Sequence, residues 1–297
     1  MKKAFVFWVE EYFYNPTPLQ KLLSFILLPL SWLYCFLMYL RYRFQSAEDF
    51  GINIISVGNL TVGGSGKTPL VTALAQKYAK PAVILRGYGR HSSGMIVVKD
   101  ENGIRCDVER SGDEAMIYAK KLPDAIVIVS EERKTAIQKA KELGSEIIFL
   151  DDAYSKHTIK KRDIVIDVKT KNNFCLPSGP YRERLYKNKE ALLVKEGRDF
   201  TREVHVNNPT PKMSLVTAIA RPGRLDQYLP SVVAKHYFED HHHFTKEELE
   251  AIIEKDAATS LLVTFKDYVK MEHFGLPLSL LDLEVKVKED VIKKFVA

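Results

Sequence analysis

The 297-residue sequence has few cysteines, and the three that it has are far apart. Cys35, Cys106 and Cys175 are odd in number and lack the paired spacings of zinc ligands, which argues against a zinc centre built on them. We therefore expect each of them to be a buried or incidental thiol in a protein of a reducing compartment. The sequence also lacks internal repeats and low-complexity tracts.

A concentrated block of basic charge is lacking as well. The net charge is +6 and the pI is near 8.9, but Lys and Arg alternate with Glu and Asp along most of the chain. A nucleic-acid-binding surface is more concentrated than this, so we expect no nucleic-acid partner and attribute the excess to a membrane surface or an anionic substrate. With 46% apolar residues, the chain is long enough for two packed domains, or one large domain with appendages.

Only one stretch reaches the length of a membrane span: residues 22–40 carry no charge over nineteen residues. A secretory signal is not expected, because Glu10 and Glu11 precede the run and bulky residues follow it. Pro29 would kink a single span. Side chains typical of a membrane interface lie in or just after the run, namely Trp32, Tyr34, Tyr39, Arg41, Tyr42 and Arg43. We favour a helix lying in or dipping into the bilayer surface over a true span or a buried soluble helix pair.

Residues 52–71, INIISVGNLTVGGSGKTPLV, combine a β-branched strand, a glycine-rich turn and a Lys-Thr pair. This order predicts a phosphate-binding loop, because glycines let backbone N–H groups approach phosphate oxygens. Lys67 would reach the β- and γ-phosphates, and the Thr68 hydroxyl would ligate Mg²⁺. Thr61 replaces the first glycine of the strict pattern, although Gly58 lies three residues earlier. The nucleotide-binding residues predicted here are Gly63, Gly64, Ser65, Gly66, Lys67 and Thr68.

Downstream, strand-like and helix-like segments alternate, which predicts an α/β fold with a mainly parallel sheet. The expected strands are 52–57, 82–86, 125–129, 146–150 and 164–168. The expected helices are 69–78, 113–121 and 133–143. A hairpin with Asn102-Gly103 at its turn should lie inside this scheme. Strands near 215–219 and 261–265 and a helix through 247–255 predict a smaller second lobe.

We therefore expect a P-loop NTPase domain with a smaller second α/β lobe and a membrane-associated helical segment. The divisions are 1–45 for the N-terminal membrane-associated helix region, 46–175 for the P-loop nucleotide-binding core, and 176–297 for a linker and the C-terminal lobe. That lobe is expected to complete the active site.

Two acidic pairs stand where chemistry is expected. Asp151 and Asp152 end an apolar strand, as a Walker B carboxylate does when it holds Mg²⁺, although such acids are also common as helix caps. Asp113 and Glu114 begin a predicted helix. They can simply cap it, or provide a carboxylate base that accepts a proton from an attacking hydroxyl.

Two further groups are ambiguous from the residues alone. Arg86 and Arg90 flank a glycine-rich turn and either bind phosphate or lie in solvent. Asp240 precedes three consecutive histidines, which cannot all point at one ion. One histidine paired with a carboxylate is a more economical arrangement, and a surface tract without function stays open.

Eight motifs occur together in the order and rough spacing of one family: GNLTVGGSGKTP, RGYGR, GDEA, DDAYSK, LPSGPYRERL, ARPGRL, FEDHHHFT and TFKDYVK. Over nearly its whole length the chain resembles the tetraacyldisaccharide 4'-kinases, which phosphorylate the lipid A precursor. The resemblance implies transfer of the ATP γ-phosphoryl group, with Mg²⁺, to the 4'-hydroxyl of a tetraacyldisaccharide 1-phosphate. It also implies work at the cytosolic face of the bacterial inner membrane, with attachment through the N-terminal apolar helix.

By matching motifs, the resemblance implies that Asp113 is the base and that His241 pairs with Asp240 as its partner. The implied catalytic set is Lys67, Asp113, Asp240 and His241. The implied metal set is Thr68, Asp151 and Asp152. The candidates for substrate or phosphate contacts are Arg86, Arg90, Glu114 and Arg182.

Two departures from the family pattern matter. Where the family has DDGFQH, this chain reads DDAYSKH, so Ala153 replaces a glycine and His157 is displaced by one residue. A role for that histidine is therefore not carried over. Ala115 replaces the proline after GDE, which should alter the helix start more than the chemistry.

Two other functions stay open at this point. A membrane-associated P-loop ATPase switch acting on a protein partner would share the phosphate loop and the acidic strand end. It would not need a carboxylate base paired to a distant Asp-His motif. A soluble small-molecule kinase would bury the N-terminal helices.

Overall fold

The structure is a computed structural model that describes residues 2–63, 65–219, 222–240 and 242–291. The chain divides into two compact units, each built from two separate stretches of sequence. Unit 1 is Met1–Lys67 with Leu150–Asp199, and unit 2 is Thr68–Phe149 with Phe200–Ala297. Helices and strands are present in both units, so the chain is an α/β protein as predicted.

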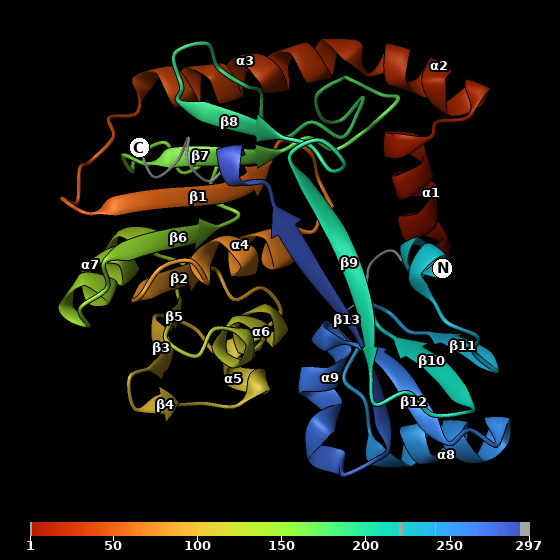
Figure 1. The fold of residues 1–297 in the computed structure, drawn as a ribbon. Coiled ribbons are helices and arrows are strands. Elements are labelled where there is room, and N and C mark those ends of the chain that lie inside the picture. Colours follow the sequence, from red (N-terminus) through yellow and green to blue (C-terminus); the bar gives the residue numbers. More distant parts are fainter. Residues whose placement is uncertain (1, 64, 220–221, 241, 292–297) are drawn as a thin grey trace. The chain divides into compact units, whose positions relative to one another are not determined.

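Unit 1 contains the parallel strands β1 (Asn53–Asn59), β7 (Arg162–Ile166) and β8 (Ala191–Val194), shown in Figure 1. β7 lies between the other two, with Ile55 opposite Arg162 and Ile164 opposite Leu192. Nearly every side chain of β1 and β7 is buried, as is usual for parallel strands covered on both faces. The carboxyl end of β1 leads directly into the glycine-rich segment predicted to bind phosphate.

Three helices begin unit 1: α1 (Lys2–Tyr14), α2 (Pro18–Ile26) and α3 (Leu28–Phe44). Thr17 caps α2 through a capping box with Gln20. Pro29 lies in the first turn of α3, and α2 and α3 meet at a bend of 59°. This bend confirms the predicted kink. Its cause is that proline lacks an N–H and clashes with the preceding turn. Among the described residues no single helix has the length and hydropathy of a membrane span, whereas the bent pair α2 and α3 together has both.

The first part of unit 2 contains β2 (Pro81–Leu85) and β5 (Ile126–Val129), which are parallel, and β3 (Ile96–Asp100), which is antiparallel to β5. β3 forms the predicted hairpin with β4 (Gly103–Ile104). The helices here are α4 (Lys67–Ala75), α5 (Val108–Ser111), α6 (Asp113–Lys121) and α7 (Arg133–Glu142). Lys99 stabilises α6, because its buried ammonium donates to the carbonyls of Ala119 and Leu122 at the helix end. β6 (Ile147–Asp151) crosses the boundary between the units.

The second part of unit 2 is a five-stranded mixed sheet in the order β11-β10-β12-β13-β9. Its strands are β9 (Phe200–Asn207), β10 (Met213–Thr217), β11 (Ala234–Tyr237), β12 (Ser260–Thr264) and β13 (Leu278–Val287). β9 is antiparallel to β13, and the other pairs are parallel. Alternate side chains of β10 and β12 enter two apolar clusters, one of them against α8 (Lys246–Asp256) and α9 (Phe265–Met271). Two short 3₁₀ helices, Pro222–Tyr228 and Glu272–Phe274, complete this part.

The predicted strands and helices agree with the structure to within about three residues at each end, and the limits of α6 are those predicted. The sequence analysis did not assign β8, β9, β11 and β13, although apolar and polar residues alternate over residues 281–287 of β13. β9 and β13 form a long antiparallel pair, from Phe200 opposite Val287 to Asn207 opposite Leu280. Contacts of that kind join segments far apart in the chain and leave no local pattern.

The expectation that all three cysteines are free thiols is wrong. Cys35, on α3, is bonded to Cys175 in a disulfide, with 6.2 Å between the two Cα atoms. The two residues are 140 positions apart, so sequence spacing could not show that the fold brings them together. Cys106 is free.

Candidate active site

Two glycines of the glycine-rich segment in unit 1 have a conformation compatible with a phosphate loop. Gly63 and Gly66 both have positive φ, 87° and 74°, a conformation that favours glycine. Gly64 lies outside the described residues. Helix α4 begins at Lys67, so the positive end of the helix follows the loop at once.

Beside this loop, two cationic side chains converge on Asp152. The Lys67 ammonium is 3.7 Å from the Asp152 carboxylate, and Arg182 forms an ion pair with the same carboxylate. Both cations also donate to the amide oxygen of Asn59, at the end of β1, over 3.3 Å. The Asn59 amide group in turn donates to the carbonyl of Thr61 over 2.8 Å, which ties the cluster to the start of the loop.

The expected metal ligands are oxygen donors. Asp151 ends β6 and is 3% exposed. The next residue, Asp152, has a backbone φ of 50°, which is outside the strand conformation, and its side chain is 40% exposed. Thr68 lies in the first turn of α4. Within the described residues, no group of three or more His, Cys, Asp or Glu side chains could hold a metal by itself. A hydroxyl with one or two carboxylates is nevertheless the usual protein contribution to Mg²⁺, which takes its other ligands from phosphate and water. The oxygen chemistry of these side chains therefore fits Mg²⁺.

In unit 2, Asp113 begins α6 and is 5% exposed. Gly112 precedes it with φ of 82°, which allows the sharp turn into the helix. The Lys266 ammonium lies 3.7 Å from the Asp113 carboxylate and 2.8 Å from that of Asp240. Burial by itself lowers the pKa of Lys266, but Asp113, Asp240 and Glu114 outweigh it, so this pKa is raised and Lys266 is charged at neutral pH.

The structure describes two of the three consecutive histidines, His242 and His243. His241 lies outside the described residues, so its pairing stays a prediction. The His242 ring stacks on Phe238 and its Nε2 lies 2.9 Å from the Glu248 carboxylate. The ring of His243 is 4.9 Å from that of His91. His242 and His243 therefore have different neighbours.

The two arginines of the RGYGR turn are in different environments. The Arg90 guanidinium is 2% exposed, forms an ion pair with Glu131 and donates to the carbonyl of Gly94. The Arg90 side chain therefore stabilises the loop in which it lies. Arg86 is exposed, and Glu114 is half-buried in the first turn of α6.

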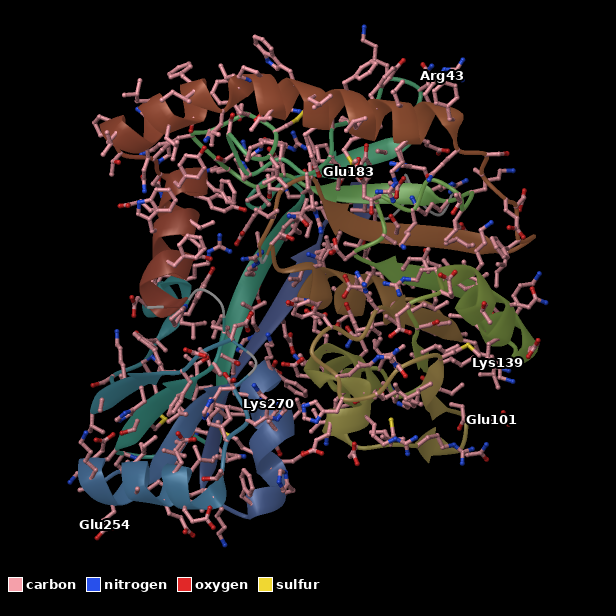
Figure 2. The ribbon with its side chains drawn as sticks, turned by 180° about the vertical axis from the view of Figure 1, so that it is seen from behind. Arg43, Glu101, Lys139, Glu183, Glu254 and Lys270 are labelled. Atoms are coloured by element: carbon pink, nitrogen blue, oxygen red, sulfur yellow. A yellow bond between two sulfur atoms is a disulfide. The ribbon has the colours of Figure 1, made fainter. Side chains whose placement is uncertain are left out.

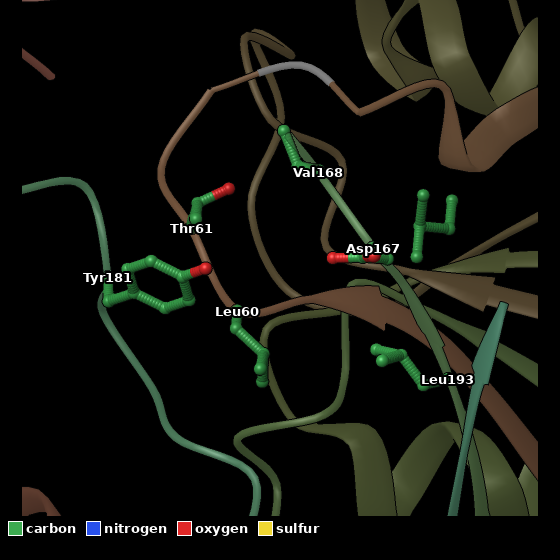
Figure 3. Close-up of a pocket in the computed structure, with 7 residues that line it drawn as sticks. Leu60, Thr61, Asp167, Val168, Tyr181 and Leu193 are labelled. Atoms are coloured by element: carbon green, nitrogen blue, oxygen red, sulfur yellow. The ribbon is translucent and has the colours of Figure 1, made fainter. Parts of the chain in front are cut away.

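A small pocket lies next to the phosphate loop, at the carboxyl ends of β1, β7 and β8 (Figure 3). It is lined by Leu60, Thr61, Ile166, Asp167, Val168, Tyr181 and Leu193. Its volume of about 20 Å³ is enough for roughly one water molecule and too small for a nucleotide base.

Comparison with known proteins decides the family. A sequence model of the tetraacyldisaccharide-1-P 4'-kinases, LpxK, matches residues 23–297. The chain belongs to this family. It is 47% identical to a tetraacyldisaccharide 4'-kinase of Aliarcobacter butzleri, with 98% of this chain and 96% of the relative covered. The corresponding figures for the Helicobacter pylori (strain J99) enzyme of the same name are 45%, 97% and 93%.

A solved structure supports this family assignment. The LpxK of Aquifex aeolicus, in a crystal structure with ATP, matches with a TM-score of 0.71 and 26% identity. The match covers 92% of this chain and 98% of that one. The fold is therefore that of an LpxK kinase for which an ATP complex is known.

Sequence analysis did not assign two residues that contact predicted site residues, Asn59 in unit 1 and Lys266 in unit 2. Asn59 and Lys266 both lie inside family motifs, GNLTVGG and TFKDYVK, but nothing in their spacing shows which carboxylates or cations they contact.

His157, displaced from the family position, is buried with its Nδ1 3.1 Å from the Lys189 ammonium and its Nε2 3.7 Å from the Glu183 carboxylate. Burial lowers the pKa of His157, so this ring is held neutral inside unit 1.

Proposed function

We propose that this ATP-dependent tetraacyldisaccharide 4'-kinase transfers the γ-phosphoryl group of ATP to the 4'-hydroxyl of a tetraacyldisaccharide 1-phosphate with Asp113 as the base. Family membership carries the activity, and the convergence of Lys67 and Arg182 on Asp152 beside the glycine loop carries the proposed phosphate site. In the division that we propose, residues 1–45 bind the membrane, 46–175 form the P-loop nucleotide core and 176–297 form the linker and second lobe.

The phosphate end of the reaction needs positive charge. We infer that Lys67 and Arg182 exchange their contacts with Asp152 for contacts with the β- and γ-phosphates when ATP binds, because a triphosphate carries more charge than one carboxylate. Asn59 keeps the two cations on the same side of the loop, since its amide oxygen accepts from both. Phosphoryl transfer depends mainly on such positioning and charge neutralisation.

Thr68, Asp151 and Asp152 are the residues that would hold Mg²⁺. When bound there, Mg²⁺ would neutralise charge on the β- and γ-phosphates.

At the acceptor end, the sugar oxygen forms a bond to the γ-phosphorus as the bond from that phosphorus to the bridging oxygen of ADP breaks. ADP leaves with the electron pair, and the proton of the 4'-hydroxyl passes to a carboxylate oxygen of Asp113. The position of Asp113 at the N-terminus of α6 favours its anionic form, as a general base requires.

The N-terminal helices provide the proposed membrane surface, which would place the enzyme at the cytosolic face of the inner membrane, where ATP is available. Large apolar side chains of α1–α3 are more than 40% exposed, among them Phe5, Phe7, Trp8, Leu22, Phe25, Trp32, Leu33, Phe36 and Leu37. Many side chains of α2 and α3 point away from the strands of unit 1, and Arg43 lies at the end of α3 (Figure 2). So many exposed large apolar side chains on three successive helices are unusual unless a bilayer or partner covers them. This exposure supports a membrane-associated segment over a buried soluble helix pair.

Polar contacts tie α3 lengthwise to unit 1. The Ser31 hydroxyl donates to the Cys175 carbonyl over 2.9 Å, Tyr34 to the Arg182 carbonyl over 3.0 Å, and Arg41 to the Ser155 carbonyl over 3.2 Å. A helix held along one face to a folded unit lies on a bilayer surface more easily than across it. An enzyme anchored in this way would meet its acylated substrate by a search in two dimensions.

The test is transfer of labelled phosphate from ATP to a tetraacyldisaccharide 1-phosphate in mixed micelles with Mg²⁺. Asp113→Asn should lower transfer about a hundredfold or more while ATP still binds, because a general base contributes on that order. Glu101→Gln, at the exposed turn of the β3–β4 hairpin, is the matched control and should transfer like the parent. Full transfer by Asp113→Asn would refute the base. ATP hydrolysis that ignores the lipid, with no transfer by the parent, would favour the ATPase switch.

A further inference from the structure

The contact between α6 and α9 in unit 2 places an ammonium group against the proposed base. Lys266 approaches Asp113 from the first turn of α9, and its side chain is 19% exposed while that of Asp113 is 5% exposed. On its other side it pairs with Asp240, whose carboxylate is 37% exposed. Lys266 therefore lies between a buried carboxylate and a more open one, which is not the arrangement of an ordinary surface ion pair.

We propose that Lys266 is a positioning residue for phosphoryl transfer, which holds the Asp113 carboxylate ionised and oriented while Asp240 holds Lys266. This inference rests on the proposed role of Asp113 as the base. It assigns to the lysine of the TFKDYVK motif a role in the acceptor half of the reaction.

The start of α9 is built rigidly enough to hold Lys266 in place. Thr264 caps the helix, and the neighbouring Asp267 is fully buried. The Asp267 carboxylate accepts from the Thr217 hydroxyl over 2.7 Å and from the Ala218 N–H over 3.1 Å, at the end of β10. Lys270, one turn further, pairs with Asp267 at 3.5 Å. The backbone that carries Lys266 is thus fixed to the sheet on one side and to α6 on the other.

The charges around Asp113 set the direction of the effect. On α6, Glu114 also attracts Lys266. The other cations of α6 are paired away from the base, Lys120 with Glu272 and Lys121 with Asp282. A nearby positive charge favours the ionised form of a carboxyl group, so Lys266 opposes protonation of Asp113 before the hydroxyl arrives. Asp240 offsets part of that charge, which leaves Asp113 able to accept a proton during the reaction.

The decisive measurement is the pH dependence of kcat/KM for the disaccharide with saturating ATP in Lys266→Gln and Lys266→Met. Both variants remove the charge, and methionine keeps the apolar stem of the side chain. An opposite charge at such a distance lowers a carboxyl pKa by about one unit or more, so the acidic limb of the profile should move to higher pH by about that amount. At a pH on this limb the variants would be about tenfold slower than the parent, relative to their own plateaus at high pH. Lys266→Arg should keep the parent profile.

Lys246→Gln, at the exposed start of α8, is the control and should leave the profile unchanged. A folded Lys266→Gln or Lys266→Met protein whose acidic limb does not move would overturn the proposal, even if its plateau falls. Asp113→Asn separates this failure from that of the proposed function. Loss of transfer in Asp113→Asn together with an unmoved limb refutes Lys266 alone, whereas full transfer in Asp113→Asn refutes the base and with it the role of Lys266.

Discussion

The hydroxyl of Tyr14, at the end of α1, donates a hydrogen bond to the carbonyl of Val62, directly before the first glycine of the phosphate loop. Tyr12, two residues earlier, donates to the Pro177 carbonyl over 3.1 Å. The Val62 N–H donates to the Pro180 carbonyl over 2.9 Å, so the entrance of the loop is held from two sides. Helix α1, which carries the exposed residues Phe5, Phe7 and Trp8, thus contacts the glycine-rich loop that we propose to bind the nucleotide.

Removal of the Tyr14 hydroxyl should weaken ATP binding. A hydrogen bond of this kind contributes about 1 kcal/mol, so Tyr14→Phe should raise the Kd for ATP about fivefold, measured by titration calorimetry in detergent. Tyr39→Phe, on a more exposed part of α3, is the matched control. Equal ATP affinity of Tyr14→Phe and the parent would show that the bond does not hold the loop in its binding form.

Replacement of Arg182 should slow phosphoryl transfer more than it weakens substrate binding. Arg182→Met removes one of the two cations that converge on Asp152, and loss of a donor aimed at developing charge costs about a hundredfold in kcat. Steady-state kinetics with varied ATP would measure it. Arg184→Met, two residues away and stacked on Tyr181, tests the loss of an arginine from the same loop. An equal loss of kcat in both variants would contradict a specific role of Arg182 in phosphoryl transfer.

Lys189 should make the stability of the protein rise with pH in a defined window. Burial, followed by the charge of Lys161, lowers the pKa of Lys189 to about 8, despite its ion pair with Asp163 at 3.1 Å. The unfolded chain, with an ordinary lysine pKa near about 10.4, binds more protons between these two values. The free energy of unfolding should therefore increase as pH rises from about 8 to about 10 through this group.

Denaturant unfolding of the parent and of Lys189→Met over this pH range measures the effect as a difference. Other groups titrate in the same range and contribute equally to both proteins. The parent should gain stability relative to Lys189→Met as pH rises. A constant difference between the two proteins would show that Lys189 has an ordinary pKa in the folded state.

Charged residues on the exposed face of α3 should release the protein from membranes. Trp32 and Phe36 are 68% and 56% exposed. Burial of one such side chain contributes about 1.5–3 kcal/mol, so Trp32→Glu with Phe36→Glu should lower binding to anionic vesicles at least about tenfold while ATP affinity in detergent persists. Tyr88→Glu, in an exposed loop of unit 2, controls for the loss of an exposed aromatic residue. Unchanged sedimentation with vesicles would contradict an apolar membrane surface on α3.

Several local features could be predicted because they depend on neighbouring residues. The strand, glycine turn and Lys67-Thr68 pair form a phosphate-loop pattern within twenty residues, and α4 begins at Lys67, two residues before the predicted start. Helix α6 begins at Asp113 because a glycine precedes two acids in its first turn. The bend before α3 follows from Pro29. In each case backbone sterics or a helix terminus acts over only a few residues.

The contacts that give these residues their chemistry depend on the tertiary structure. Arg182 meets Asp152 across 30 positions, and Lys266 meets Asp113 across more than 150. Cys35 and Cys175 were expected to be separate thiols and are bonded. Such pairs are brought together by strand order and helix packing, which depend on the burial of apolar surface over the whole chain and not on local spacing. The sequence by itself thus identified candidates for binding phosphate and accepting a proton, and only the tertiary structure decided which charges surround them.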